Sequence, residues 1–466
     1  MRFGKSLGVF SAGLLLFLAG CSSSMNSTPP GSTASLFSLV TDAPPTLPSV
    51  VSFQVLITGV TVNNSGGSVS VLANSSMVDF ARFDGLHELL NLDSVPPGQY
   101  TSVTINGSSP VIGFLDTSGG AGVPPVLNTM NATPGTLSVT VPLTKTLVVE
   151  PNDLVGLLID LDLGQTIQTS NGQVTGTITP TFDIKGLTAD DTEAEIDDFR
   201  GGVTNVDTTN MAFTIQGVRG RSWNVTTDSN TEFDDGAAFS NLAVNDIVEV
   251  SGKLDPVTHG IKADEVEVLS TNGFFAGGLA TFVNPPSPAA ATQLQLYVRA
   301  ELPNLAPAAP IGQIDSFTLD GSENYFIADF RNPLSSLLFS NTTLAPGQRI
   351  SVGGKMTVSG GTTTLTVHRV VLGRQGQQGL WVPGSTQVQS GNAGSFQLND
   401  NFLAGVLLPQ PVTVMTTNFT TFVNLAGLSA LTGAGPIRLR VVGFILMNQQ
   451  TNTPVIVARR VVQLAP

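Results

Sequence analysis

Apolar residues alternate with polar ones along many short segments of the chain, and this period of two is the feature that most restricts the fold. Such segments run from Val51 to Ile57, from Leu137 to Val141 and from Leu157 to Leu163. Successive side chains of a strand point to opposite faces, so each segment forms a strand with one face in a core. Gly, Pro and Asn separate the segments, as is typical of antiparallel strands joined by turns. The sequence therefore predicts an all-β protein.

The composition argues against long helices and for several domains. Charged residues make up 12% of the 466 residues, while Gly and Pro number 49 and 29. Surface helices need charged helix formers and are destabilised by Gly and Pro. A chain of this length also exceeds the size of one hydrophobic core, so two to four domains are expected. We predict an N-terminal antiparallel β-sandwich followed by two to three small β-barrel-like modules.

The N-terminus has the features of a signal peptide over residues 1–20. A cationic start precedes an apolar run from Val9 to Leu18, which is too short to span about 30 Å of hydrocarbon. The next residues, Leu18-Ala19-Gly20-Cys21, resemble the lipobox of bacterial lipoproteins, which implies that the thiol of Cys21 carries lipid. Cys21 is the only cysteine, so no disulfide forms within the chain and the domains rely on burial.

Residues 21–35 are polar and patternless, and we expect them to form a lipidated flexible tether. The protein is then extracytoplasmic and held to the bacterial cell envelope through its N-terminal lipid. Ser22 stands where Asp would favour inner-membrane retention, so the outer membrane is the better expectation. The formal charge of −14 becomes −16 after cleavage, because the leader contains Arg2 and Lys5 and no acid. Such a surface makes nucleic acid a poor partner.

A resemblance to a known family covers residues 36–186, the predicted sandwich. It rests on these segments: Thr41-Asp42-Ala43-Pro44, Leu89-Leu90-Asn91-Leu92, Pro97-Gly98-Gln99-Tyr100, Leu158 to Leu163 and Ile178-Thr179-Pro180. They are similar to domain-of-unknown-function family 4382 of bacterial exported proteins. The resemblance implies a β-sandwich and brings no catalytic residues. Residues 187–199 follow as an acidic linker, extended or with one short helical turn.

An internal repeat organises the rest of the chain. Leu242 to Gly252 aligns without gaps to Leu344 to Gly354, and a looser third copy includes residues 437–443. Asn245 and Gly347 take the same position in the alignment, and both residue types suit a left-handed turn. Each copy ends on a similar strand, in which the final residue is Val266, Val370 or Val461.

The repeat predicts three modules, at residues 200–270, 273–373 and 380–466. The first, from Gly202 through Phe233 to Val268, resembles family 5666 of unknown function, which implies a small exported barrel reminiscent of an OB-fold. The second and third modules match this family less well. The segment Gly376-Gln377-Gln378-Gly379 is interpreted as a polar linker between them.

Motifs for catalysis or cofactor binding are absent from the sequence. There is no G-x-S-x-G elbow, phosphate-binding loop or dinucleotide fingerprint, and we predict no cofactor and no enzymatic activity. His87, His259 and His368 fall in different modules and are interpreted as surface or turn histidines. With Cys21 as the only cysteine, thiolate metal sites are excluded.

Carboxylates are the only reactive groups present in quantity. Asp160 and Asp162 lie on one face of a predicted strand, about 7 Å apart, a spacing compatible with calcium or with an acid and base pair. We interpret this face as solvated, which leaves the two residues as weak calcium candidates. The acidic run from Asp190 to Asp198 is a similar candidate without a D-x-D-x-D-G loop.

These features favour a non-enzymatic envelope lipoprotein that acts as a surface binding or structural module for an envelope protein or surface polymer. The alternative is a carboxylate-based secreted hydrolase or calcium-dependent binding protein, which requires Asp42, Asp160 or Asp162 to converge with other acids in one pocket. Pairing of an edge strand with a partner strand is a third hypothesis.

Overall fold

The computed structural model describes residues 33–464 apart from 44–48, 84–85, 121, 171–172, 218–221, 234–236, 272, 304, 306–307, 328–336, 401–407, 409 and 433–436. Nearly all of the described chain is β-structure, which confirms the predicted fold class. Cys21 lies outside the described residues. In the described part, no helix is long and apolar enough to cross a membrane.

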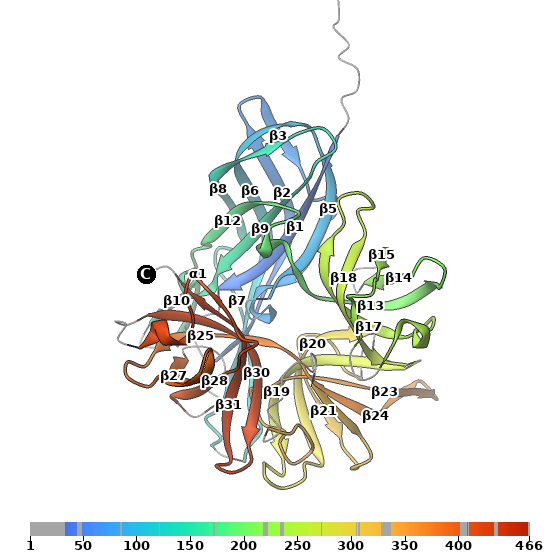
Figure 1. Ribbon diagram of the computed structural model, residues 1–466, viewed down its shortest axis with the longest axis vertical. Coiled ribbons are helices and arrows are strands. Elements are labelled where there is room, and N and C mark those ends of the chain that lie inside the picture. Colours follow the sequence, from blue (N-terminus) through green and yellow to red (C-terminus); the bar gives the residue numbers. More distant parts are fainter. Residues whose placement is uncertain are drawn as a thin grey trace, which may run out of the picture.

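Two sheets pack face to face and form the sandwich (Figure 1). The first sheet has the order β12 (Phe182–Thr188), β9 (Leu154–Asp162), β1 (Ala34–Ala43), β5 (Glu88–Val95). The second has the order β3 (Gly67–Ser70), β2 (Val50–Asn64), β6 (Gly98–Asp116), β7 (Val126–Asn131), with β4 (Ser76–Asp79) on β2 and β8 (Thr136–Val149) on β6. Shorter elements are η1 (Phe80–Arg82), α1 (Leu163–Thr166) and the hairpin β10 (Ile167–Ser170) and β11 (Gln173–Ile178).

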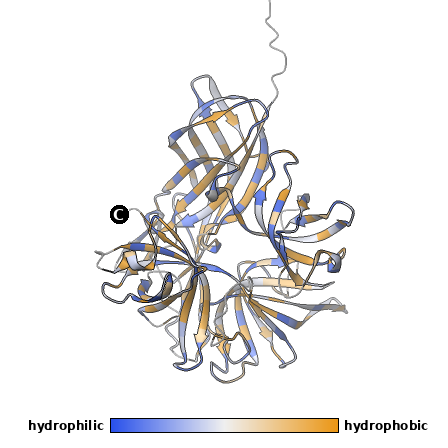
Figure 2. Cartoon of the chain, in the orientation of Figure 1, coloured by the Kyte–Doolittle hydropathy of each residue, from blue (hydrophilic) through white to orange (hydrophobic). Residues whose placement is uncertain are grey.

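The inner faces of the two sheets share one core. Val55 of β2, Ile105 of β6 and Ile159 of β9 are each at most 2% exposed and pack in the same cluster. Hydrophobic and hydrophilic residues alternate along many of these strands (Figure 2). Pairing in the first sheet is antiparallel except between β1 and β9, which are parallel. The predicted alternation is therefore the pattern that builds this core.

Three barrels follow the sandwich. The first barrel contains β13 (Ile196–Asp207), β14 (Ala212–Gly217), β15 (Ser222–Thr226), β16 (Glu232–Phe233), β17 (Ile247–Leu254) and β18 (Ile261–Ser270). The second barrel contains β19 (Phe274–Asn284), β20 (Gln293–Leu302), β21 (Ile314–Thr318), β22 (Asn324–Ile327), β23 (Arg349–Ser359) and β24 (Thr362–Leu372). The third barrel contains β25 (Gln375–Trp381), β26 (Gln387–Ser390), β27 (Ala393–Asp400), β28 (Val412–Thr416), β29 (Thr421–Val423), β30 (Arg438–Asn448) and β31 (Thr453–Gln463). Single 3-10 turns are η2 (Thr192–Ala194), η4 (Phe239–Asn241) and η5 (Leu428–Leu431).

The three barrels share one pattern of strand pairing. In each, the first strand (β13, β19 or β25) pairs with the first strand of the last hairpin and with one earlier strand, which is β14, β20 or β27. A short strand (β16, β22 or β29) pairs in parallel with the last strand. In the first and third barrels, β15–β18 and β28–β31 pairs also close a five-stranded ring. The repeated sequence pattern therefore corresponds to a repeated fold.

The repeat glycines occupy equivalent β-bulges. Gly252, Gly354 and Gly443 each stand at a register shift in the last hairpin of their barrel. A Cβ on any of them would overlap a carbonyl oxygen of the opposing strand, so only glycine fits. The turn prediction is also confirmed, because Asn245 and Gly347 have φ values of 75° and 89°.

The interpretation of Gly376 to Gly379 as a linker is wrong. These residues belong to β25, and Gln377 and Gln378 are buried. The preceding Gln375 joins the second and third barrels, because its Oε1 accepts a hydrogen bond from the amide of Arg349 at 2.7 Å. The segment looks like a linker because it is polar, but it is a buried strand, and the amide of the preceding Gln375 bonds to the second barrel. The acidic stretch likewise contains η2 and enters β13 at the fully buried Ile196.

The four modules are arranged around a common centre (Figure 1). The sandwich stands at the top of this view, and the three barrels follow around the centre in chain order. Ion pairs link the sandwich to the third barrel, and hydrogen bonds link it to the first and second barrels. Functional side chains are therefore to be sought at the seams between modules as well as inside each module.

Candidate functional site

The outer face of the first sandwich sheet is covered rather than solvated. Leu154 and Leu158, which share this face of β9 with Asp160, pack into the core of the first barrel. The interpretation of the Asp160 face as a wet surface is therefore wrong. Alternation shows which residues share a face, but it does not show whether another module covers that face.

Further along this face, a polar row crosses the sheet. Thr41 of β1 is in register with Asp160 of β9, and Asp160 is in register with Asp183 of β12. On the other side of β1, Val40 pairs with Glu88, which places His87 beside Thr41. Three polar residues of adjacent strands and His87, which directly precedes β5, thus lie at one level of the sheet.

The third barrel stands over this row and leaves a cleft of about 330 Å³, which we call the seam cleft. Its sandwich wall includes Thr41, His87, Asp160 and Asp183, and its barrel wall includes Arg440. Small-molecule sites commonly have volumes of about 300–1,000 Å³, so the seam cleft has room for one small ligand.

Charges of both signs line the seam cleft. The Nζ atom of Lys185 lies 3.0 Å from Oε1 of Glu193, and Nη2 of Arg440 lies 3.9 Å from Oδ2 of Asp160. Asp183 is exposed, and its side chain makes no ion pair or hydrogen bond with any described residue. The cleft wall therefore contains three carboxylates and two cations, with each cation already paired to a carboxylate.

The floor of the seam cleft contains buried polar atoms that lack hydrogen bonds in the described chain. Thr41 is 1% exposed and its Oγ1 has no hydrogen bond. The Nδ1 atom of the buried His87 has no hydrogen bond either, but it lies 3.7 Å from Oδ2 of Asp197. Buried polar groups are nearly always hydrogen-bonded, and an unpaired one costs about 1–3 kcal/mol. The Thr41 hydroxyl is therefore the buried atom of the floor that a molecule in the cleft would satisfy.

His87 also joins the sandwich to the first barrel. Its amide donates a hydrogen bond of 2.9 Å to Oδ2 of Asp197, and the amide of Asp197 donates one of 3.0 Å to the carbonyl oxygen of His87. The interpretation of His87 as a surface or turn histidine is wrong, because the first and third barrels cover it. Burial lowers the pKa of His87 below its usual 6.5, the charge of Asp197 opposes this shift, and Arg460 and Arg440 add to it.

The lowered pKa of His87 predicts a loss of stability in acid. The unfolded chain takes up the proton first, so the free energy of unfolding falls as the pH drops below about 6.5, by up to about 1.4 kcal/mol per pH unit. Burial raises the pKa of Asp79 and of Glu195, and these groups shift stability in the opposite direction. We expect that His87→Gln removes this acid-dependent fall in the free energy of unfolding, as measured by urea titrations between pH 7 and 5. The exposed His368→Gln variant serves as the control, and an unchanged His87→Gln profile would contradict the assignment.

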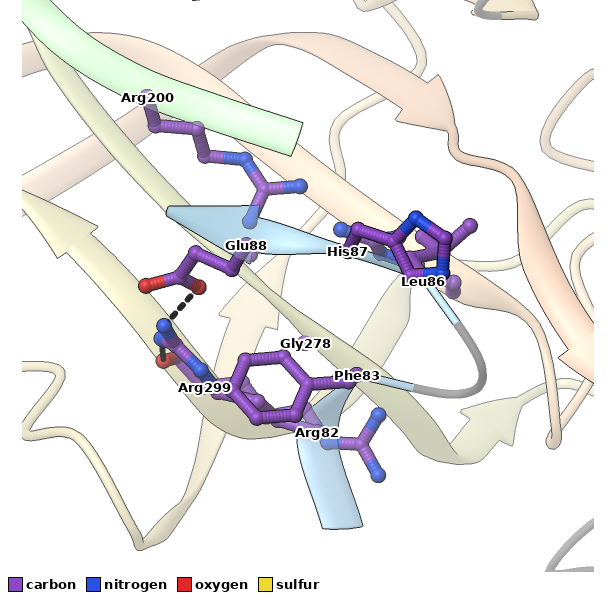
Figure 3. A pocket seen from close by; sticks show the side chains of 10 residues that line it. Arg82, Phe83, Leu86, His87, Glu88, Arg200, Gly278 and Arg299 are labelled. Carbon is purple, nitrogen blue, oxygen red and sulfur yellow. Dashed lines mark hydrogen bonds and ion pairs between the residues drawn. The ribbon is translucent and has the colours of Figure 1, made fainter. Parts of the chain in front are cut away.

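Arginines gather where the sandwich, first barrel and second barrel meet (Figure 3). Arg82 pairs with Glu88 and donates to the carbonyl oxygen of Arg299 at 3.4 Å. Arg200 pairs with Glu249 at 2.6 Å. The space among these side chains is about 20 Å³, which is the volume of about one water molecule. This junction holds modules together and does not have room for a ligand.

A second cleft, of about 470 Å³, lies between the first and second barrels. Arg369 is part of its wall. The guanidinium carbon of Arg369 lies 3.9 Å from the ring centroid of Phe326, and its Nη2 lies 3.6 Å from Oε1 of Glu267. His368 stands exposed on its wall. The seam cleft is the stronger candidate, because it combines the buried Thr41 hydroxyl, which has no hydrogen bond among the described residues, with three carboxylates on its wall.

Among the remaining predicted residues, Asp42 and Asp162 lie on the neighbouring strands β1 and β9, and His259 lies elsewhere. Asp162 caps α1 by accepting a hydrogen bond from the amide of Gln165 at 2.9 Å. Asp42 is fully buried in β1, and His259 lies in the turn between β17 and β18 near Ser35. Among the described residues, no group of three or more His, Cys, Asp or Glu side chains could hold a metal ion.

Sequence reasoning found Asp160 but missed Thr41, Asp183 and Arg440. A charged residue inside an otherwise apolar strand is the available signal, and both Asp160 and Arg440 carry it. No signal in the sequence indicates that the strands that contain these two residues face each other.

Comparisons with known proteins identify domains and no activity. Residues 33–180 match the family model of a domain of unknown function, DUF4382, and residues 200–267 match that of another, DUF5666. The two resemblances expected from the sequence are thereby confirmed. No curated protein matches the chain. A solved structure, drosophila Unr CSD456, aligns at 11% identity over 57% of this chain and 97% of its own, with a TM-score of 0.14, which is too low to carry an argument.

Proposed function

We propose that the protein is a non-enzymatic, lipid-tethered binding protein of the bacterial cell envelope, and that the seam cleft holds its ligand. The observation that carries this proposal is the buried Thr41 Oγ1, which has no hydrogen bond within the described chain and lies beside the imidazole of His87 on the floor of a cleft of ligand size. The lipid on Cys21 holds the protein at a membrane, with the outer membrane as the expected location. The source of the ligand is then an envelope protein or a surface polymer.

The docking of the modules supports a binding role. The Asp160–Arg440 pair and the Glu195–Arg460 pair, at 3.9 and 4.0 Å, both join the sandwich region to the third barrel. A binding site gains affinity when its walls are already in place, because no ordering cost is then incurred on binding. The seam cleft has such preformed walls.

The proposal is tested by soaking crystals of the lipid-free mature chain with a set of small polar fragments. We expect electron density for intact fragments in the seam cleft, in hydrogen-bond contact with Thr41 or His87. Fragments bound only at other places, or an empty cleft at fragment concentrations of tens of millimolar, would contradict the proposal.

A second candidate function is hydrolysis by paired carboxylates. Its supporting observation is that Asp160, Asp183 and Glu193 line the same cleft, and two carboxylates that flank a bond are the machinery of many hydrolases. Turnover of nitrophenyl glycosides or esters that Asp183→Asn abolishes would favour this candidate. Intact fragments in the cleft and no turnover favour the binding role.

A further inference from the structure

We propose that the seam cleft binds a ligand with a primary ammonium group, and that this group lies between Asp160 and Asp183. This inference rests on the proposed function and specifies the chemical class of the ligand. It requires a small organic cation with additional hydroxyl or amide groups, of about the size of a monosaccharide.

The first argument is the balance of charge in the cleft. Lys185 and Arg440 are each engaged by a carboxylate, which leaves the Asp183 carboxylate without a countercharge among the described residues. His87 does not supply one near neutral pH, because burial lowers its pKa. A cationic ligand compensates this charge, whereas an anionic ligand adds to it.

The second argument is the position of the acceptors. Asp160 and Asp183 face each other across an antiparallel strand pair, where side chains on one face stand about 5 Å apart. An ammonium group has three donors and no acceptor, so it can bond to both carboxylates at once. Thr41 Oγ1 is in register with Asp160 and offers a further acceptor one strand away.

The third argument is the chemistry of the other residues that line the seam cleft. The side-chain amide of Asn424 donates a hydrogen bond of 3.3 Å to the backbone carbonyl oxygen of Gln463, and the remaining donors and acceptors of these two residues and the imidazole of His87 face neutral polar groups of the ligand. Leu158 forms part of the floor. The chain as a whole has a formal charge of −14, so its field attracts cations toward the cleft.

The test compares two probes that differ in one group, glucamine and sorbitol, in which a primary ammonium of the first replaces a hydroxyl of the second. Isothermal titration uses the mature chain with Cys21→Ser at pH 7.5 and 0.15 M salt. We expect glucamine to bind at least about tenfold more tightly than sorbitol, as expected for one charge-assisted hydrogen bond. Equal affinities, or no binding of glucamine, would overturn the inference.

Variants locate the ammonium group. Asp183→Asn is expected to weaken glucamine binding at least about tenfold and to leave sorbitol unchanged, whereas Asp183→Glu retains most of the affinity. Asp116→Asn is the matched control, because it removes the same charge from an exposed turn of the second sandwich sheet. Asp183 is exposed, so unchanged thermal unfolding is expected to show that the Asn variant is folded.

The outcomes separate this inference from the proposed function. If fragments or sorbitol occupy the cleft and Asp183→Asn does not affect glucamine, the ammonium assignment is wrong and the binding site remains. If neither probe binds and the soaked crystals also show an empty cleft, both proposals are wrong.

Discussion

Replacing Cys21 with serine is expected to abolish fatty-acid labelling and to release the protein from the membrane fraction. The thiol is the only atom in the chain to which the lipid of a lipobox cysteine can be attached, because no second cysteine exists. A serine hydroxyl does not replace it in this processing step. The measurement is metabolic labelling with a radioactive fatty acid followed by membrane fractionation, and the expected loss is complete.

A nearby substitution controls for changes in export. Ser23→Ala alters the predicted tether and leaves the lipobox intact, so labelling and membrane retention are expected to match the wild type. Labelling that persists in the Cys21→Ser protein would show that the lipid is attached elsewhere and that the predicted anchor is wrong.

Alanine at a bulge glycine is expected to destabilise its barrel by about 3 kcal/mol or more. The new Cβ overlaps the backbone of the opposing strand, which cannot move aside as a flexible side chain can. Gly252→Ala brings its Cβ against the carbonyl of Lys262, and Gly443→Ala brings it against that of Val457. Each barrel concerned contains one buried tryptophan, Trp223 or Trp381. Urea unfolding followed by tryptophan fluorescence therefore reports on each barrel separately, when the other tryptophan is replaced by phenylalanine.

Gly202→Ala is the matched control in the first barrel, because a Cβ there meets no atom within 4 Å. Its effect on the free energy of unfolding is expected to stay within about 0.5 kcal/mol. A bulge variant as stable as this control would mean that the glycines of the repeat do not occupy equivalent strained positions.

Much of the fold could be predicted from local patterns. Alternation at Val51 to Ile57 and at Leu157 to Leu163 indicated strands, because one face of each is in a core. The alignment of Asn245 with Gly347 succeeded because a left-handed turn restricts which residues can occupy it. Features of this kind depend on a few neighbouring residues, which the sequence shows directly.

Contacts between modules could not be predicted in the same way. The strand at Gln375 to Trp381 was missed because its buried glutamines have no apolar period, and the hydrogen bonds of Gln375 go to the second barrel. His87 was misjudged for a similar reason, since a buried histidine next to another module looks like a turn histidine in the sequence.

The same limit applies to the candidate site. Asp160 could be selected because a carboxylate is unusual in an apolar strand, but the face it occupies was taken as solvated. Arg440, which completes the opposite wall, lies 280 positions later in the numbering and on a different module. The site exists only because the sandwich and the third barrel dock against each other.

Docking across the seam cleft is therefore the central claim, and the distance between the sandwich and the third barrel tests it most directly. Nitroxide labels at Ser138 of β8 and Gln387 of β26, both exposed, can be introduced as the only cysteines in the Cys21→Ser chain. A second pair of labels within the sandwich, at Ser65 and Thr117, gives the width of the distance distribution that is expected for one rigid module. Double electron–electron resonance is predicted to give a single distance for the first pair, with a width like that of the second. A broad or multiple distribution for the first pair alone would show that the modules move independently, and it would contradict the seam cleft as a binding site.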